Sequence, residues 1–429
     1  MLAVLFVVFL VVMALGVPIA FAMGFGAVSA FMYGMPRGMM TIPTKVFGGL
    51  DSFSLMAIPF FILAGDLMSE SGISRKLINF ADLLVGWIRG GMALVCVTSC
   101  VIFAAVCGSA SASTSAIGGI MISSMTEKGY AKGFTSCLVA SGGTLGPIIP
   151  PSILAVIYAS ATGLSVGALF MAGLVPGLIL AAFLGLIAYI YACWKPEILA
   201  KVSARYVTKP YALKTCMEAF PALFMPVIII GGILSGIMTA TEASGVACIY
   251  SIVVGFLTRS LTIRSCWDVF AKSAVSVSRL MIIIGVATLF GWILSVRQLP
   301  AMAANFLTGC SDNRYVVMLL IIGLLIVIGF FMETIAALII LAPVLYPIGE
   351  QLGFSPIQFA MVFFITLLFG GITPPVGIQL YITSSIAGIR LTESLRYIGP
   401  FILAFIVVIM LVLFVPSFSV WLPEMLGLC

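Results

Sequence analysis

The chain has 429 residues, of which 62% are hydrophobic and only 8% are charged. A soluble globular protein carries about 25% charged residues, so this composition excludes that class and predicts a polytopic, all-α membrane protein. The net charge of +6 does not indicate a nucleic-acid partner, because excess Lys and Arg in a membrane protein mark loop orientation. The sequence contains no His, the commonest general base and transition-metal ligand, which argues against an intramembrane enzyme.

Long apolar runs recur along the whole chain, as expected for a protein embedded in a lipid bilayer. Residues 2–34 are expected to form one long or kinked helix, followed by a loop over 35–51. The expected parts are an N-terminal scaffold helix and loop, a first repeat, basic cytoplasmic loops with scaffold helices, a second repeat and a C-terminal tail, at residues 1–51, 52–193, 194–279, 280–414 and 415–429.

Two proline-rich stretches interrupt apolar runs, Gly142–Ser152 and Gly370–Gly377. Proline has no backbone N–H and clashes with the preceding turn, so a helix cannot continue through these stretches unbroken. In hydrocarbon each freed backbone group costs several kcal/mol unless protein, water or an ion satisfies it. The sequence therefore predicts two broken helices, over residues 133–162 and 357–387, at an ion or substrate site.

Two further polar interruptions, Gly108–Thr114 and Phe331–Thr334, lie within the apolar runs 91–126 and 315–349. The flanks of the first are each about 16 residues long, whereas a span needs about 20. We therefore expect two re-entrant hairpins with polar tips inside the membrane. For the first run, one tilted helix with a Ser-rich packing stripe is the alternative.

The two halves of the chain match in the same order. Pro150-Pro151 and Pro374-Pro375 are separated by an offset of 224, and the same offset pairs Pro176 with Pro400. This indicates an internal structural repeat. If each hairpin returns to its own side, nearly all Lys and Arg fall in cytoplasmic loops; the exceptions are Arg37, Lys45, Arg297 and Arg314. The count predicts inverted repeats with a cytoplasmic N-terminus and a periplasmic C-terminus.

The four interruptions are expected to converge on one site. Ser and Thr hydroxyls and freed carbonyls are hard oxygen ligands that suit Na⁺, and the N-termini of half-helices favour an anion. We expect two cation sites that flank one anion site. The candidate substrate-binding residues are Ser109, Ser111, Thr144, Glu333 and Thr334.

Three acidic residues in or near apolar runs require separate interpretation. Glu333 either contacts substrate or ion or holds its hairpin tip by a structural bond. Asp66 lies near a helix end and is expected to reach the membrane interface, and Glu242 is expected to cap a helix.

With these residues in place, the chain resembles the large membrane subunit of TRAP (tripartite ATP-independent periplasmic) transporters. The matching stretches are Ile58–Gly65, Gly108–Thr114, Gly142–Ser152, Pro221–Ala243 and Gly370–Gly377. The resemblance implies an elevator-type ion-transporter fold. It also implies Na⁺-driven uptake of a small organic anion, such as a dicarboxylate, keto acid or sugar acid, across the bacterial inner membrane. The implied partners are a separate small four-helix membrane subunit and a periplasmic substrate-binding protein.

The same resemblance implies two Na⁺ sites, each shared by a hairpin and a broken helix. The first would use the 108–114 tip, and the second would use the end of the first arm of the other hairpin. The implied ligands are Ser109, Gly146, Ile149 and Pro150 in the first site and Gly329, Gly370, Thr373 and Val376 in the second.

Two other kinds of membrane transport protein are alternatives. One is a stand-alone ion-coupled dicarboxylate or citrate carrier with the same repeats and no binding protein. The other is a channel, which the broken helices favour less, because they suit an occluded site better than a continuous pore.

Overall fold

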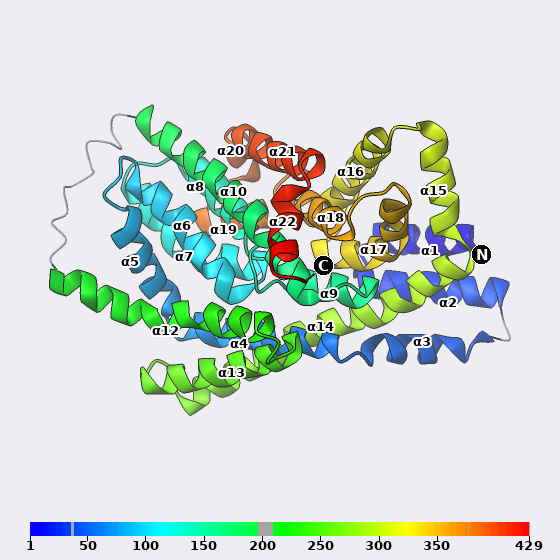
Figure 1. The fold of residues 1–429 in the computed structure, drawn as a ribbon, viewed down its shortest axis with the longest axis horizontal. Helices are drawn as coiled ribbons and strands as arrows, with labels where there is room; N and C mark the ends of the chain where they lie inside the picture. Colours follow the sequence, from blue (N-terminus) through cyan, green and yellow to red (C-terminus); the bar gives the residue numbers. More distant parts are fainter. Residues whose placement is uncertain (36–37, 196–208, 376, 429) are drawn as a thin grey trace.

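The computed structural model describes residues 1–35, 38–195, 209–375 and 377–428. Within these ranges every regular element is a helix, which confirms the all-α prediction (Figure 1). Six of the helices are long and apolar enough to cross a membrane, or eight if each of two bent helix pairs is counted as one span. The composition and the described fold therefore agree on a polytopic membrane protein.

The first half of the chain is a succession of helices separated by short breaks. They are α1 (Leu2–Ala14), α2 (Ile19–Gly34), α3 (Thr41–Leu50), η2 (Ser54–Met56), α4 (Ala57–Glu70), α5 (Ile73–Val85), α6 (Gly91–Cys107), α7 (Ala110–Glu127), α8 (Lys132–Gly143), α9 (Ile153–Thr162) and α10 (Val166–Cys193).

The second half continues in the same manner. Its helices are α12 (Lys209–Leu234), α13 (Ala240–Leu257), α14 (Ile263–Val296), α15 (Leu299–Cys310), α16 (Arg314–Phe331), α17 (Thr334–Gln351), α18 (Pro356–Gly370), α19 (Ile378–Ala387), α20 (Leu391–Leu395), α21 (Gly399–Phe414) and α22 (Ser417–Met425). At the start of α13, Glu242 completes a capping box with Thr239, as expected from the sequence.

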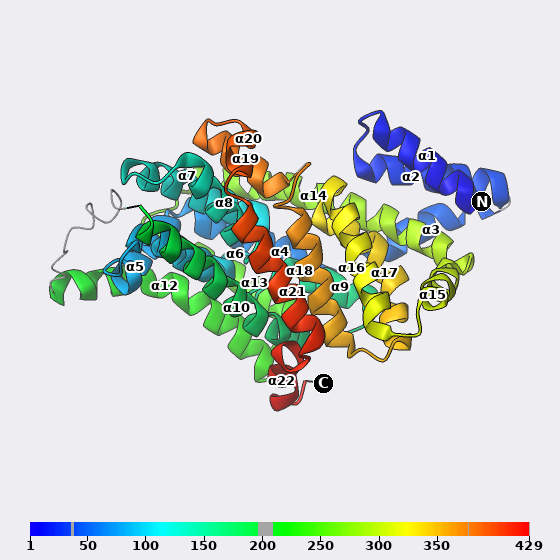
Figure 2. The same cartoon turned by 90° about the horizontal axis from the view of Figure 1, so that it is seen from above.

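The N-terminal segment folds back on itself. A methyl group added at Gly26 of α2 would lie 2.9 Å from the carbonyl oxygen of Leu5, and one at Gly34 would lie 3.0 Å from the sulfur of Met1. Therefore α1 and α2 are antiparallel neighbours, at one end of the molecule in Figure 2. The single helix expected over residues 2–34 is wrong. The prediction of a cytoplasmic N-terminus assumed that this single helix crosses the membrane once, and the antiparallel pair α1–α2 removes that assumption.

Several segments expected as loops or tail are helical. The reason is that their mixed polar and apolar residues are too polar for a membrane span but still permit an amphipathic helix. They are α3 in the expected loop 35–51, the first part of α14 in 259–279, α15 in 297–314 and α22 in the tail 415–429. The boundary drawn at residue 279 therefore falls inside one continuous helix of 34 residues.

The interruption after α6 reverses the chain. Both α6 and α7 pack against α8, where Cys100 lies beside Gly142 and Thr114 lies beside Gly143. Residues before and after the tip thus meet α8 at the same level, so α6 and α7 form an antiparallel hairpin. Gly108 ends α6 with φ +62°, a conformation that other residues rarely adopt. In the second half, α16 and α17 likewise both pack against α18.

The second parts of the broken helices cross to the opposite half of the chain. Helix α9 packs against α17, whereas α19 packs against α7 and α8. The hairpins α6–α7 and α16–α17 lie on either side of α18 and α21 in both views (Figures 1 and 2). Helices α3 and α4 pack against α14 along one side of this assembly. This arrangement brings the four interruptions into one region.

Gln358 ties α18 to α21. Its side chain is 3% exposed, and its Nε2 donates hydrogen bonds to the carbonyls of Val412 (3.1 Å) and Leu413 (2.8 Å). Replacement by Leu would leave two buried carbonyls without this donor, at an expected cost of about 1–3 kcal/mol.

We therefore expect Gln358→Leu to lower the thermal unfolding midpoint of the detergent-purified chain. Gln351, which is exposed at the end of α17, provides the matched Gln→Leu control and should change stability by less than about 0.5 kcal/mol. Equal midpoints for the two variants would contradict a structural role for the Gln358 amide.

Candidate functional site

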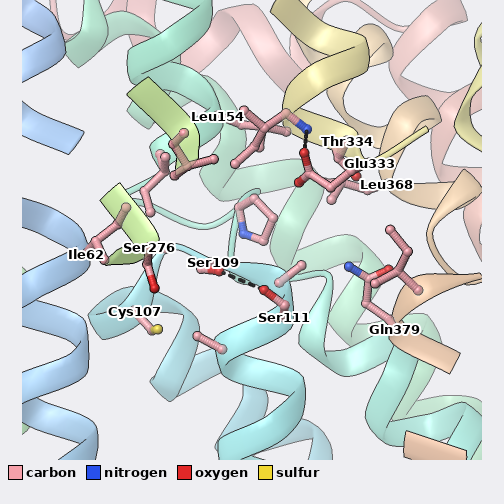
Figure 3. A pocket seen from close by; sticks show the side chains of 18 of the residues that line it. Ile62, Cys107, Ser109, Ser111, Leu154, Ser276, Glu333, Thr334, Leu368 and Gln379 are labelled. Atoms are coloured by element: carbon pink, nitrogen blue, oxygen red, sulfur yellow. Dashed lines mark hydrogen bonds between the residues drawn. The ribbon is translucent and has the colours of Figure 1, made fainter. Parts of the chain in front are cut away.

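A cavity of about 320 Å³ lies where the four interruptions and their flanking residues meet α4 and α14 (Figure 3). Ligand sites for small molecules begin at about this size. The first turns of four helices line it: α7 through Ser109 and its neighbours, α9 through Ile153, α17 through Thr334 and α19 through Gln379. A helix N-terminus carries a partial positive charge, although side chains of Ser152 and Glu333 already accept hydrogen bonds from first-turn N–H groups of α9 and α17. The cavity is therefore electrostatically suited to an anion.

The first tip supplies hydroxyl groups to the cavity. Ser109 precedes α7 in an extended conformation, and its side chain makes no capping bond to the helix. Its hydroxyl lies 3.4 Å from that of Ser111, and Figure 3 shows both on the cavity wall. Two of the predicted substrate-binding residues are thus neighbours and keep hydrogen-bonding capacity for a ligand.

The second tip supplies a carboxylate and a hydroxyl. Glu333 precedes α17, and its Oε2 accepts hydrogen bonds from the backbone N–H groups of Ile335 and Ala336, both at 3.1 Å. The structural alternative weighed for Glu333 is therefore real: it caps α17. Its carboxylate and Thr334 also line the cavity, so the cap does not remove them from the site (Figure 3).

Thr144 does not line the cavity. It is fully buried in the interruption after α8, and its hydroxyl donates a hydrogen bond to the carbonyl of Ser141 at 2.6 Å. Its prediction as a substrate-binding residue is not supported by its position, because a threonine that follows a helix end satisfies its hydroxyl on the preceding turn.

Two charged residues that the sequence did not assign to the site line the cavity from other helices. Asp66 of α4 accepts a hydrogen bond from the hydroxyl of Ser273 at 2.6 Å. Arg279 of α14 lies on the cavity wall one turn after Ser276. Sequence reasoning placed Arg279 in a cytoplasmic loop, since the polar first part of α14 did not resemble a span. For Asp66, an isolated acidic residue within an apolar run was the sequence feature that could have indicated a place in the site.

The residues expected at the first cation site lie together. A methyl group added at Gly146 would be 2.9 Å from both the carbonyl oxygen of Ser109 and the hydroxyl oxygen of Ser113. Pro150 removes the N–H that would otherwise bond the Gly146 carbonyl. The buried hydroxyls of Ser113 and Thr114 have no hydrogen-bond partner. These two hydroxyl oxygens and the Ser109 carbonyl, which accepts a hydrogen bond from the Ser113 N–H, form a cradle around a glycine that fits a small hard cation.

The other two expected ligands of this site, Ile149 and Pro150, lie in the same interruption between α8 and α9. The side chain of Ile149 packs against Gly177 of α10, so only its backbone is available as a ligand.

The residues expected at the second cation site also come together, between α16 and α18. A methyl group at Gly370 would lie 2.7 Å from the carbonyl oxygen of Gly329. The Thr373 hydroxyl donates to the carbonyl of Phe369 at 2.7 Å, which leaves its carbonyl and the remaining lone pair of its hydroxyl as ligands. Val376, the remaining expected ligand, lies outside the described residues.

Clusters of the usual transition-metal ligands are absent from the described part of the chain, where no group of three or more His, Cys, Asp or Glu could hold a metal ion.

Comparison with known sequences gives consistent matches along the chain. The model of the family described as "Tripartite ATP-independent periplasmic transporter, DctM component" matches residues 6–418. The C4-dicarboxylate TRAP transporter large permease protein DctM of Pseudomonas aeruginosa is 38% identical over 405 residues, which cover 94% of this chain and 93% of that one. The sialic acid TRAP transporter large permease protein SiaM of Vibrio cholerae is 35% identical over 416 residues, which cover 96% and 95%.

A third relative is longer. The isethionate TRAP transporter permease protein DctMQ of Oleidesulfovibrio alaskensis is 37% identical over 424 residues, which cover 97% of this chain but 65% of that one. Among solved structures, the YdaH transporter of Alcanivorax borkumensis shares the fold, with a TM-score of 0.65 at 15% identity over 91% of this chain and 90% of that one.

These relatives are transport proteins rather than enzymes. The family match extends over nearly the whole chain, and the curated relatives are more than 30% identical over almost all of it. The chain therefore belongs to the DctM family, the large permease components of tripartite ATP-independent periplasmic transporters.

Proposed function

We propose that the chain carries out Na⁺-coupled secondary uptake of a small organic anion across the bacterial inner membrane. The observation that supports this most directly is the cavity lined by four helix N-termini and Arg279. Helix N-termini stabilise negative charge, and a guanidinium forms strong paired hydrogen bonds with a carboxylate. A cavity of about 320 Å³ holds one small organic acid.

Charge within the cavity explains why a cation is needed. The charged residues that line the cavity are Asp66, Glu333 and Arg279, so with both carboxylates ionised the lining carries one negative charge in excess. An anionic substrate in this low-dielectric site would be repelled by that excess. Two Na⁺ ions in the oxygen cradles would change the net charge around the cavity from negative to positive. Binding of Na⁺ therefore favours binding of the anion, and by linkage the anion favours Na⁺.

The ligands proposed for the cations come from this chain alone. The first site uses the Ser109 carbonyl, the Ser113 hydroxyl and the carbonyls of Gly146, Ile149 and Pro150. The second uses the backbone oxygens of Gly329, Gly370 and Thr373. Bound Na⁺ would supply positive charge next to the substrate, and the Na⁺ gradient would supply the driving force when ion and substrate are released together on the inner side.

The proposed transport cycle is an elevator. The hairpins and broken helices form two inverted repeats that carry the site, while α3 belongs to the surrounding scaffold; α4 and α14 contribute Asp66 and Arg279 to the cavity wall. The reciprocal packing of α9 on α17 and of α19 on α7 is the arrangement that such a repeat pair requires. The basic segments 71–90, 127–132 and 388–396, the first and last of which contain α5 and α20, then face the cytoplasm, and the C-terminus faces the periplasm.

The proposed partners are a periplasmic binding protein that delivers the substrate and a small four-helix membrane subunit. The named substrates of the relatives, C4-dicarboxylate, sialic acid and isethionate, share a small anionic group. The same fold would also serve a stand-alone carrier of dicarboxylate or citrate. Reconstitution of this chain alone distinguishes the two, because uptake of free substrate without partners would support the stand-alone carrier.

The cation requirement is tested by uptake into proteoliposomes that contain the chain with its small subunit and binding protein. Labelled succinate, N-acetylneuraminate and isethionate serve as probes. We expect uptake of at least one probe to depend on an inward Na⁺ gradient and to cease when K⁺ or choline replaces Na⁺. Unchanged uptake in K⁺ would rule out Na⁺ coupling.

The first cation site is tested by Gly146→Ala. The added methyl group would press on the Ser109 carbonyl and the Ser113 hydroxyl, so we expect loss of the stabilisation that NaCl confers over KCl in thermal unfolding, with an overpacking cost of about 1–3 kcal/mol. Gly119→Ala is the control, because nothing lies within 4 Å of a methyl group there. A full Na⁺ response in Gly146→Ala would refute this ligand set.

The role of Arg279 as an anion anchor is tested by Arg279→Gln. A hydrogen bond to a charged group contributes about 1.5–3 kcal/mol, so the substrate concentration at half-maximal uptake should rise by about tenfold to a hundredfold. Arg264→Gln, exposed near the start of the same helix, should leave it unchanged. Similar values for both variants would show that Arg279 does not contact the substrate.

A further inference from the structure

Gln379 occupies the junction between the second interruption and the cavity. It is the second residue of α19, lines the cavity and is 6% exposed. Its backbone N–H donates a hydrogen bond to the carbonyl of Gly371 at 3.0 Å, across the interruption. This bond fixes the residue against the stretch that contributes Gly370 and Thr373 to the second cation site.

The amide oxygen of Gln379 is buried and has no hydrogen-bond partner. It lies directly against Gly371, since a methyl group added there would collide with it. A buried amide oxygen without a donor is costly to maintain. A cation would satisfy it, and the neighbouring backbone of residues 370–373 already provides the oxygen ligands that suit one.

The other end of the same amide faces the cavity. Figure 3 shows the nitrogen of Gln379 directed toward the space between Ser111 and Glu333. An amide nitrogen carries two N–H donors, and this one lies at the N-terminus of α19, where an anion is favoured. It is therefore placed to donate to a carboxylate or sulfonate in the cavity.

We propose that Gln379 is a coupling residue, whose Oε1 is a ligand of the second cation and whose Nε2 binds the anionic group of the substrate. The inference rests on the proposed function and extends it to the physical link between ion and substrate. Because the amide is conjugated, a cation on its oxygen withdraws electron density and makes its N–H groups stronger donors. Each ligand then strengthens the binding of the other.

A second buried glutamine, Gln358, provides a comparison with Gln379. Gln358 is also buried, but its Nε2 donates to two backbone carbonyls of α21, so its amide is used for structure. A Gln→Leu change at position 358 removes a buried amide without touching the cavity. It is the matched control for the same change at position 379.

The experiment measures thermal unfolding of the purified chain over a range of NaCl concentrations, with KCl keeping the ionic strength constant, with and without succinate, N-acetylneuraminate or isethionate. For Gln379→Leu we expect the half-maximal Na⁺ concentration to rise about tenfold and the anion to add no further stabilisation. Gln379→Glu keeps the oxygen and removes the donors, so it should retain the Na⁺ response and lose the anion response. Gln358→Leu should show both responses at a lower midpoint.

The outcomes separate the inference from the function. Wild-type Na⁺ and anion responses in Gln379→Leu would overturn the inference and leave the proposed function standing. Loss of the Na⁺ response in Gln379→Glu would overturn the assignment of the oxygen as a cation ligand. A wild-type chain that responds equally to Na⁺ and K⁺ would overturn both Na⁺ coupling and the role of Gln379 in it.

Discussion

A backbone N–H or carbonyl group in hydrocarbon must find a partner within the protein, and the four helix interruptions place many such groups in one region. The structure meets this requirement by crossing its halves: α19 returns to α7 and α8, and α9 returns to α17. Side chains then complete the bonding. Ser152 caps α9 and donates to the carbonyl of Pro147, and Glu333 caps α17. Polar atoms left over at these tips, such as the hydroxyl of Ser113, are the ones that an ion can use.

Close approach of the backbone makes this possible. At Gly146 and Gly370 an added methyl group would press on the hairpin of the same half of the chain, so these glycines let a hairpin and a broken helix share one cradle. Prolines act in the complementary way, since they withhold donors from carbonyls that a continuous helix would have consumed. The combination of glycine and proline in each motif thus has two separate physical effects, one on distance and one on hydrogen bonding.

The sequence predicted site residues from polar side chains within strongly apolar runs. Four residues chosen in this way line the cavity: Ser109, Ser111, Glu333 and Thr334. Arg279 was not predicted to line the cavity, because periodicity does not reveal that the amphipathic first part of α14 continues into a membrane span. Gln379 was not predicted, because one neutral amide after a proline motif has no distinctive pattern. Thr144 was assigned because it lies in the first proline motif, although its hydroxyl donates to the carbonyl of Ser141. The paired helices α1 and α2 show the same limit, because Gly16 and Pro18 are compatible with a kink or a reversal.

The proposed coupling of ion and substrate would follow from the small size of the cavity and the few charges within it. In water, two charges 4 Å apart interact by about 1 kcal/mol, and by about 4 kcal/mol in the partly dehydrated surroundings of a protein site. A cation bound as proposed would adjoin the cavity lining through Ser109 at the first site and Gln379 at the second, so its charge would act on the substrate with little screening. Empty cradles leave Asp66 and Glu333 to oppose an anion, and filled cradles add to Arg279 and the helix N-termini. In the proposed cycle the same few residues would therefore determine both the affinity for the substrate and the requirement for the ion, without a separate transmission path.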